Sequence, residues 1–125
     1  MFNVLIADSH PIARTGLQIV VERVAELLRD ECVIAFSDDA FSTFRKAKRL
    51  QPDLILLSTT LPLTGGPQTV SALRAYAPRT KVLVLSDDED SGDLSALLEA
   101  GAHGVLSKGE STRALEERIG ALLTR

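Results

Sequence analysis

Apolar residues follow two alternating patterns along the chain. Five short aliphatic runs, at residues 2–7, 32–36, 53–57, 81–85 and 104–106, are separated by longer segments in which apolar residues recur every three or four positions. A continuous aliphatic run is typical of a strand buried on both faces of a sheet, and the longer spacing is typical of a helix with one buried side. The pattern therefore predicts five strands, each followed by a helix.

The helix boundaries are indicated by capping and breaking residues. Pro11 suits the first turn of a helix that runs to about Leu28, with Ser9 as its candidate N-cap. The second helix begins within residues 37–39 and ends at residues 51–52, the third ends at Pro78, the fourth ends at Gly101, and the last begins near Ser111. The expected inward-facing residues are Leu17, Val21, Val24 and Leu28; Phe41, Phe44 and Ala47; Val70, Leu73 and Ala77; Leu94, Leu97 and Leu98; and Leu115, Ile119 and Leu122.

The first helix carries more apolar residues than one buried side requires. Gly16, Val20 and Leu27 form a second stripe beside the first. This additional stripe marks the helix as a candidate contact surface.

Regular alternation of strand and helix predicts an α/β fold with a parallel sheet covered on both faces. Right-handed crossovers between five strands favour a doubly wound sheet of order 2-1-3-4-5, as in flavodoxin-like (βα)5 folds. Neither a repeat nor a linker interrupts the pattern, so residues 1–125 are expected to form one domain.

Composition limits the classes of function. The hydrophobic content of 45%, the charged content of 25% and the net charge of −3 are typical of a globular protein and argue against nucleic-acid binding by these residues. No apolar run reaches the ~18 residues of a membrane span, and no basic leader precedes the first strand, so we expect a cytoplasmic protein. The single cysteine, Cys32, fits a reducing compartment and is expected to be a buried core thiol.

The predicted strand order brings several polar residues to one crevice. Asp8 and Ser9 follow the first strand, Ser58 follows the third, Ser86 the fourth, and Lys108 the fifth. In open α/β sheets, sites form at the carboxyl ends of the strands, where the strand order reverses. These residues are therefore the candidate functional site.

At these positions the sequence resembles the receiver domains of two-component response regulators, over nearly its whole length. The matching segments are VLIADSHP at residues 4–11, PDLILLS at 52–58, LPLTGG at 61–66 and GAHGVLSK at 101–108. The HP pair, the long first helix and the LSKG ending resemble the subfamily that carries a C-terminal helix-turn-helix. The resemblance implies a longer transcription regulator, with these residues as its N-terminal regulatory part.

The resemblance also implies a chemistry, which is phosphoryl transfer from a histidine kinase to an aspartate after the third strand. Two acids after the first strand and the receiving aspartate hold Mg²⁺ in that family, and a hydroxyl and a lysine contact the phosphoryl group. The first acid is present as Asp8, the hydroxyl as Ser86 and the lysine as Lys108. Ser9 replaces the second acid, and Ser58 replaces the receiving aspartate. The sequence thus resembles a degenerate receiver.

These two losses predict an altered cleft. Mg²⁺ prefers anionic oxygen ligands, so a site reduced to Asp8 is expected to bind it weakly or not at all. A serine hydroxyl needs a base before it can attack phosphorus, and a lysine cation does not supply one. We expect Asp8 and Lys108 to pair instead and to hold the cleft in one state without any cofactor.

Other interpretations start from particular residues. Ser58 is an alternative phosphoryl acceptor that would use Mg²⁺, and it is a weaker candidate for a hydrolase nucleophile, although no G-x-S-x-G motif surrounds it. His10 is expected to be exposed at the start of the first helix, and His103 is expected to be a surface residue. Asp87, Asp88, Glu89, Asp90 and Asp93 form an acidic run, which is more typical of a solvated loop than of replacement metal ligands.

The leading hypothesis is therefore a non-enzymatic signalling module that acts through protein contacts, including a homodimer. The candidate contact faces are the fourth helix with the fifth strand and fifth helix, or the apolar first helix with the fifth helix. DNA binding would belong to a separate C-terminal domain and not to these residues. A stand-alone adaptor is equally compatible with the sequence.

Overall fold

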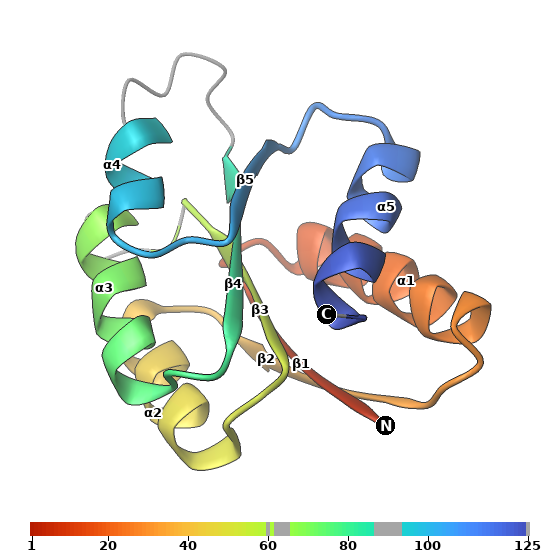
Figure 1. Cartoon of the computed structure of the whole chain (residues 1–125), viewed down its shortest axis with the longest axis horizontal. Helices are drawn as coiled ribbons and strands as arrows, with labels where there is room; N and C mark the ends of the chain where they lie inside the picture. Colours follow the sequence, from red (N-terminus) through yellow and green to blue (C-terminus); the bar gives the residue numbers. More distant parts are fainter. Residues whose placement is uncertain (60, 62–65, 87–93, 125) are drawn as a thin grey trace.

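A five-stranded parallel sheet lies between two layers of helices in the computed structural model of the chain (Figure 1). The structure describes residues 1–59, 61, 66–86 and 94–124. The strands are β1 (Phe2–Ala7), β2 (Cys32–Ser37), β3 (Leu54–Ser58), β4 (Lys81–Ser86) and β5 (Gly104–Ser107). The helices are α1 (Pro11–Leu27), α2 (Ala40–Leu50), α3 (Gly66–Tyr76), α4 (Leu94–Glu99) and α5 (Thr112–Leu123).

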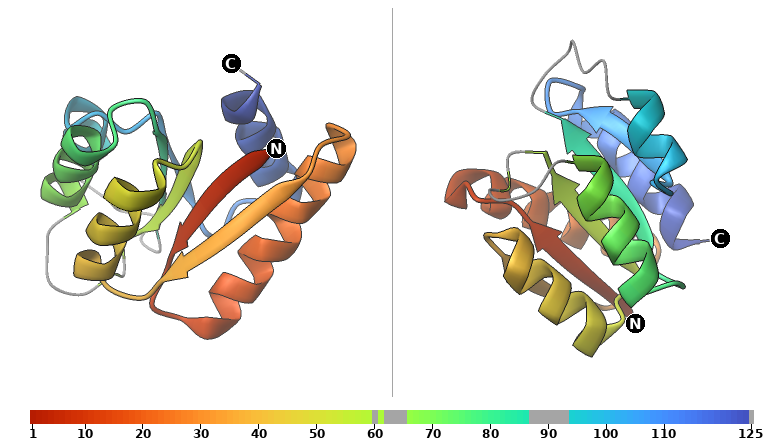
Figure 2. Two further views of the ribbon diagram at one scale, coloured as in Figure 1. Left: turned by 90° about the horizontal axis from the view of Figure 1, so that it is seen from below. Right: turned by 90° about the vertical axis from the view of Figure 1, so that its left-hand side faces the viewer.

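The strand order is β2-β1-β3-β4-β5, and every neighbouring pair is parallel. The predicted doubly wound fold is thus confirmed. Helices α2, α3 and α4 lie side by side over one face of the sheet, and α1 and α5 cover the other (Figures 1 and 2).

Alternate residues of the central strands face opposite helix layers. Leu5 and Ala7 of β1 pack toward α2, α3 and α4, whereas Val4 and Ile6 pack toward α1 and α5. All five residues of β3 are buried, as the continuous aliphatic run predicted. The sheet therefore has an apolar core on each face.

Several helix-boundary predictions are confirmed. Ser111 caps α5 by accepting a hydrogen bond from the Ala114 amide at 3.1 Å. Gly101 follows α4 with a φ of +113°, a conformation that glycine adopts without strain. At α1 the prediction was wrong, because the N-cap position belongs to His10 and not to Ser9.

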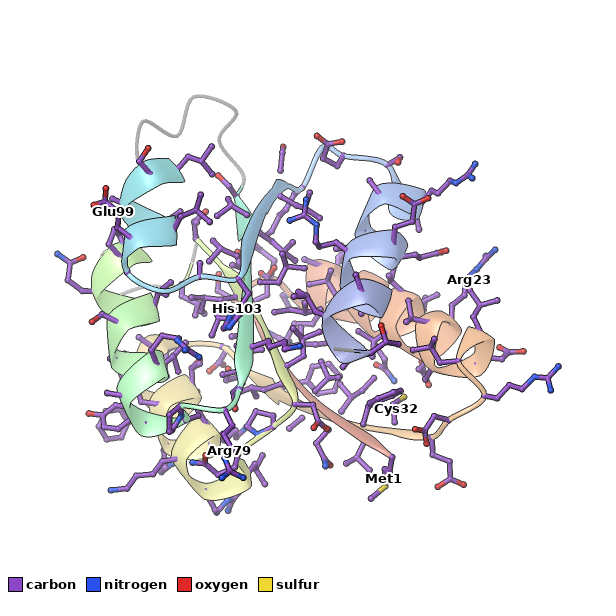
Figure 3. All side chains as sticks on the ribbon, viewed as in Figure 1. Met1, Arg23, Cys32, Arg79, Glu99 and His103 are labelled. Atoms are coloured by element: carbon purple, nitrogen blue, oxygen red, sulfur yellow. The ribbon has the colours of Figure 1, made fainter. Side chains whose placement is uncertain are left out.

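Three predicted inward-facing residues are instead exposed. Phe41 lies in the first turn of α2 and is 68% exposed, and Leu94 and Leu98 of α4 are each nearly half exposed. Helices α2 and α4 thus bury fewer apolar side chains than the sequence spacing predicted. Of the predicted inward-facing residues, Leu97 of α4 and Ala47 of α2 are fully buried in the core. Cys32 is also only partly buried, at the start of an edge strand (Figure 3).

The extra apolar stripe of α1 is only partly covered. Leu17, Val21 and Val24 are buried as predicted, whereas Leu27 is 68% exposed and Val20 packs at the edge of the core. Two isoleucines, Ile12 and Ile19, are also exposed on this helix, at 89% and 61%. Helix α1 thus presents an apolar outer surface.

Candidate functional site

The carboxyl ends of four strands form the candidate site. The carboxyl ends of β1, β3, β4 and β5 lie at one edge of the sheet. The strand register places Ala7 beside Leu57, Ser58 beside Leu85, and Ser86 beside Ser107. Backbone hydrogen bonding between β4 and β5 continues beyond the end of β5. The Lys108 amide donates to the Ser86 carbonyl at 2.8 Å. The structure therefore brings the predicted residues Asp8, Ser58, Ser86 and Lys108 to one place.

Asp8 and Lys108 form a buried ion pair across this edge. Lys108 Nζ lies 2.8 Å from Asp8 Oδ2; Asp8 is fully buried and the Lys108 side chain is 21% exposed. The other carboxylate oxygen, Oδ1, accepts a hydrogen bond from the His10 amide at 2.9 Å. Both oxygens of Asp8 are thus occupied by groups of the chain itself, and the predicted pairing is confirmed.

Arg14 also contacts this site, and the sequence reasoning missed it. Its guanidinium Nη1 donates to the Asp8 main-chain carbonyl at 2.7 Å. Arg14 lies in the first turn of α1, six residues after Asp8, so its reach toward the strand end follows from the tight β1–α1 connection. This contact ties α1 to the strand end that carries Asp8.

The two serines that end β3 and β4 are buried and engaged in polar interactions. Ser58 and Ser86 are 2% and 3% exposed, and neither is without a partner. A cavity of about 10 Å³ adjoins Ser58 and is lined by Thr69 and Gly66 among others. This volume holds about one water molecule. Ser9, in contrast, is half-buried in the loop between β1 and α1.

The resemblance to receivers implies Mg²⁺, and the residues described here fit that ion poorly. Mg²⁺ favours several anionic oxygens in octahedral geometry. Asp8 supplies one carboxylate, which is already paired with Lys108, and Ser9 and Ser58 offer only neutral hydroxyls. No cluster of three or more histidine, cysteine or acidic side chains that could hold a metal ion occurs among the described residues. The acidic run of residues 87–93 lies outside them.

The two histidines are placed differently from the buried Ser58. His10 is exposed, as expected, and contacts Asp8 through its main-chain amide. His103 precedes β5, so it lies at the end of the sheet opposite to Ser58. This arrangement gives no support to a serine–histidine dyad.

His103 is exposed, as predicted, and it also has a structural role (Figure 3). Its Nδ1 accepts a hydrogen bond from the Val82 amide at 3.0 Å, and its own amide donates to the Val82 carbonyl at 2.8 Å. Partial burial lowers the pKa of His103, and the charges of Arg74 and Lys81 lower it further. The neutral imidazole therefore extends the β4–β5 pairing by one residue.

Comparison with known proteins shows one consistent relationship. Residues 4–120 match the family described as response regulator receiver domain. The nitrate/nitrite response regulator protein NarP of Escherichia coli (strain K12) is 35% identical over 120 residues, which cover 96% of this chain and 54% of NarP. The chain spans about half the length of the curated relatives it matches.

Solved structures agree in fold. A LuxR-family two-component response regulator from Aurantimonas sp. SI85-9A1 has a TM-score of 0.86 at 26% identity, covering 99% of this chain and 86% of that one. The signal receiver domain of the putative response regulator NarL from Mycobacterium tuberculosis has a TM-score of 0.82 at 28% identity, covering 98% and 96%. No helix in the described part of the chain is both long and apolar enough to span a membrane.

Proposed function

The chain belongs to the response regulator receiver domain family of two-component signalling, and on this basis we propose that it signals without aspartyl phosphorylation. The observation that carries this proposal is the ion pair between Lys108 and Asp8, beside a serine at the end of β3. In this proposal the lysine supplies permanently the positive charge that a metal ion would otherwise bring to Asp8. The cleft is then held in one state, and the domain is not an enzyme.

The acceptor position supports the same proposal. Ser58 carries a neutral hydroxyl, which attacks phosphorus only when a base removes its proton. The carboxylate that could act as this base is Asp8, but its two oxygens already accept from Lys108 and His10. The Lys108 amine is itself engaged with Asp8. A buried serine in these surroundings serves best as a passive hydroxyl.

The output is proposed to be a protein contact, with a homodimer as its simplest form. The exposed residues Ile12, Ile19 and Leu27 place an apolar strip on the outer surface of α1. Exposed apolar strips of this kind commonly mark protein interfaces. Arg23 on α1 forms an ion pair of 3.3 Å with Glu116 on α5, so the two helices would present one continuous surface.

We further propose that this chain is the regulatory part of a cytoplasmic transcription regulator. Its relatives include proteins named as response regulators and transcriptional regulatory proteins, and they are about twice its length. DNA binding would then reside in a separate effector domain. The receiver part would control that domain through its contact surfaces.

One experiment separates this proposal from a phosphorylated receiver. The protein is incubated with Mg²⁺ and acetyl phosphate and its intact mass is measured; in parallel, thermal unfolding is followed with Mg²⁺ and beryllofluoride. We expect no mass change and no Mg²⁺-dependent shift in the melting temperature. An aspartyl receiver of known activity, treated in the same way, shows that the reagents are active.

Two results would contradict the proposal. A mass gain of one phosphoryl group at Ser58, located by peptide mapping, would favour the alternative in which this serine accepts the phosphoryl group with Mg²⁺. Stabilisation by Mg²⁺ with beryllofluoride, without covalent change, would show that the cleft still binds the ion.

A further inference from the structure

A groove of about 260 Å³ lies between α1 and α5, adjacent to the cleft. Its apolar walls are Ala13, Gly16, Leu17 and Val20 from α1, Leu85 from β4, and Leu115 from α5. Its polar end is formed by Ser107, Lys108, Glu110 and Thr112. An apolar cavity with a few polar groups at one end is the usual form of a small-molecule site.

We propose that this groove binds a small, uncharged amphipathic molecule, with an apolar body and one hydroxyl or carbonyl head. The volume lies just below the usual range for ligand pockets, so it suits a molecule of about ten non-hydrogen atoms. The apolar walls of this groove lie outside the cleft, with which it shares Lys108. The inference does not depend on whether Ser58 accepts a phosphoryl group.

The apolar part of the groove exists because α1 carries a glycine at this position. A Cβ added to Gly16 would meet no atom within 4 Å, so open space lies directly above the helix backbone. The floor is formed by Leu17 and Leu85, which are almost completely buried. A ligand body placed here would cover apolar side chains that the two helices leave uncovered.

The polar end selects an uncharged head. Lys108 contributes a positive charge that is already matched by Asp8, and Glu110 contributes a negative charge at the exposed rim. Neither an anionic nor a cationic head would therefore find an unmatched counter-charge inside the groove. The hydroxyls of Ser107 and Thr112 can hydrogen-bond a neutral head, which needs no counter-charge.

A second copy of the chain is the competing occupant. The exposed residues Ile12 and Ile19 lie on the same side of α1 as Gly16, so a dimer through this side would also cover the mouth of the groove. The floor of the groove lies deeper, at Leu17 and Leu85, which are almost completely buried. We therefore assign the groove to a small molecule, and its response to protein concentration tests a second copy.

Lys108 belongs both to the groove and to the cleft. Its Nζ holds Asp8 on one side, and its side chain forms part of the groove wall on the other. A ligand that contacts Lys108 would therefore alter the surroundings of the buried ion pair. Occupancy of the groove would in this way reach the strand ends without any covalent modification.

The test uses 1-octanol, which has nine non-hydrogen atoms, as a probe in a two-dimensional amide NMR titration of the whole chain. We expect saturable shifts at the amides of Gly16, Val20 and Leu115, with a Kd on the order of 10⁻⁴ to 10⁻³ M for a ligand of this size. Octanoate and octylamine have the same chain with opposite charges, and we expect each to bind several-fold more weakly.

Two variants of neighbouring residues separate the groove from general surface binding. Gly16→Leu fills the open space and is expected to abolish the shifts, whereas Thr15→Leu adds the same side chain at an exposed neighbouring position and is expected to leave them unchanged. Gly16→Ala is the second variant, for use if Gly16→Leu does not fold. Its added Cβ would meet no atom within 4 Å, narrows the same space, and is expected to weaken octanol binding.

Several outcomes would overturn the proposal. Equal binding by Gly16→Leu and Thr15→Leu would place octanol elsewhere, and tighter binding of octanoate or octylamine would contradict the uncharged head. Groove amides that shift with protein concentration but not with octanol would assign the groove to a second copy of the chain.

Discussion

Lys108 and Asp8 lie 100 positions apart in the sequence, and their side chains meet at 2.8 Å. The contact joins the residue after β5 to the residue after β1, across the ends of β3 and β4. Asp8 is fully buried, so removal of Lys108 would leave a buried acidic side chain without its ion-pair partner. The ion pair is thus both a structural tie and the feature that defines the cleft.

Removal of the lysine should strongly destabilise the fold. Lys108→Met leaves the Asp8 carboxylate buried without its counter-charge, and such a loss costs about 3 kcal/mol of the free energy of unfolding. Urea denaturation measures this change. The double variant Asp8→Asn with Lys108→Met removes both charges and should recover much of the loss.

The control for that experiment is Lys48→Met, because Lys48 is an exposed lysine on α2. The free energy of unfolding of the Lys48→Met variant should differ from that of the unmodified protein by no more than about 0.5 kcal/mol. A similar small change in Lys108→Met would mean that the ion pair contributes little to the fold.

Restoration of the two missing acids should create a metal site. In Ser9→Asp with Ser58→Asp, three carboxylates would gather at one strand edge, and their mutual repulsion should lower the melting temperature in the absence of metal. Mg²⁺ should reverse this loss and stabilise the variant as its concentration rises. Thermal unfolding at several Mg²⁺ concentrations measures both effects.

Ser9→Asn with Ser58→Asn has similar shape without the charges, and it should show no Mg²⁺ response. If the acidic variant also fails to respond, then Ser9 and Ser58 are not placed as the receiver resemblance requires.

His103 should make the stability of the fold depend on pH. The fold lowers the pKa of His103 because the residue is partly buried and lies near Arg74 and Lys81, so the folded state favours the neutral imidazole. The stabilisation is fully present above the unfolded pKa of about 6.5, and it is lost as the pH falls through the lowered folded pKa. Urea denaturation at pH 7.5 and at lower pH values measures the difference.

His103→Gln does not titrate in this range and supplies a control with a similar polar side chain. The part of the pH dependence due to His103 should be absent from this variant. An identical pH profile in the two proteins would show that the hydrogen bond to Val82 does not govern it.

Self-association should depend on the outer surface of α1. Ile12→Glu and Ile19→Glu place a charge in the exposed apolar strip and should shift the protein toward monomer in sedimentation velocity experiments. Phe41→Glu changes another exposed apolar residue, on α2 in the opposite helix layer, and should leave association unchanged. A monomer for the unmodified chain at high concentration would rule out this interface.

Two glycines should respond to alanine in opposite directions. Gly101 has a φ of +113°, and a Cβ there would lie 2.8 Å from Arg74 Cγ, so Gly101→Ala should destabilise the fold by about 1–3 kcal/mol. Gly16 lies within α1 beside open space, so Gly16→Ala should stabilise it by up to about 1 kcal/mol. Thermal or urea unfolding of both variants checks the two signs.

The strands and their order could be predicted from the sequence because buried parallel strands are continuous aliphatic runs. The run before Ser58 is the clearest case, and all five residues of β3 are buried. The pairing of Asp8 with Lys108 followed from the predicted strand order, since both residues come directly after strands whose carboxyl ends border one crevice, with β3 and β4 between them.

The sequence did not predict how much of each helix the sheet would cover. Apolar spacing identifies a stripe on a helix, but the exposure of Phe41, Leu94 and Leu98 depends on where each helix lies over the sheet. The groove at Gly16 depends on the separation of α1 and α5, which no local pattern specifies. The prediction of Ser9 as the N-cap of α1 was wrong because His10, directly before Pro11, occupies the N-cap position.

A counter-charge that is part of the polypeptide is present in every copy of the protein from the moment it folds. A metal ion or a phosphoryl group can be added to a receiver and removed from it, whereas the Nζ of Lys108 is covalently part of the chain that carries Asp8. Under the proposed function, the cell would therefore adjust the signal through the number of molecules it makes and degrades. Expression level and turnover would take the place of kinase flux.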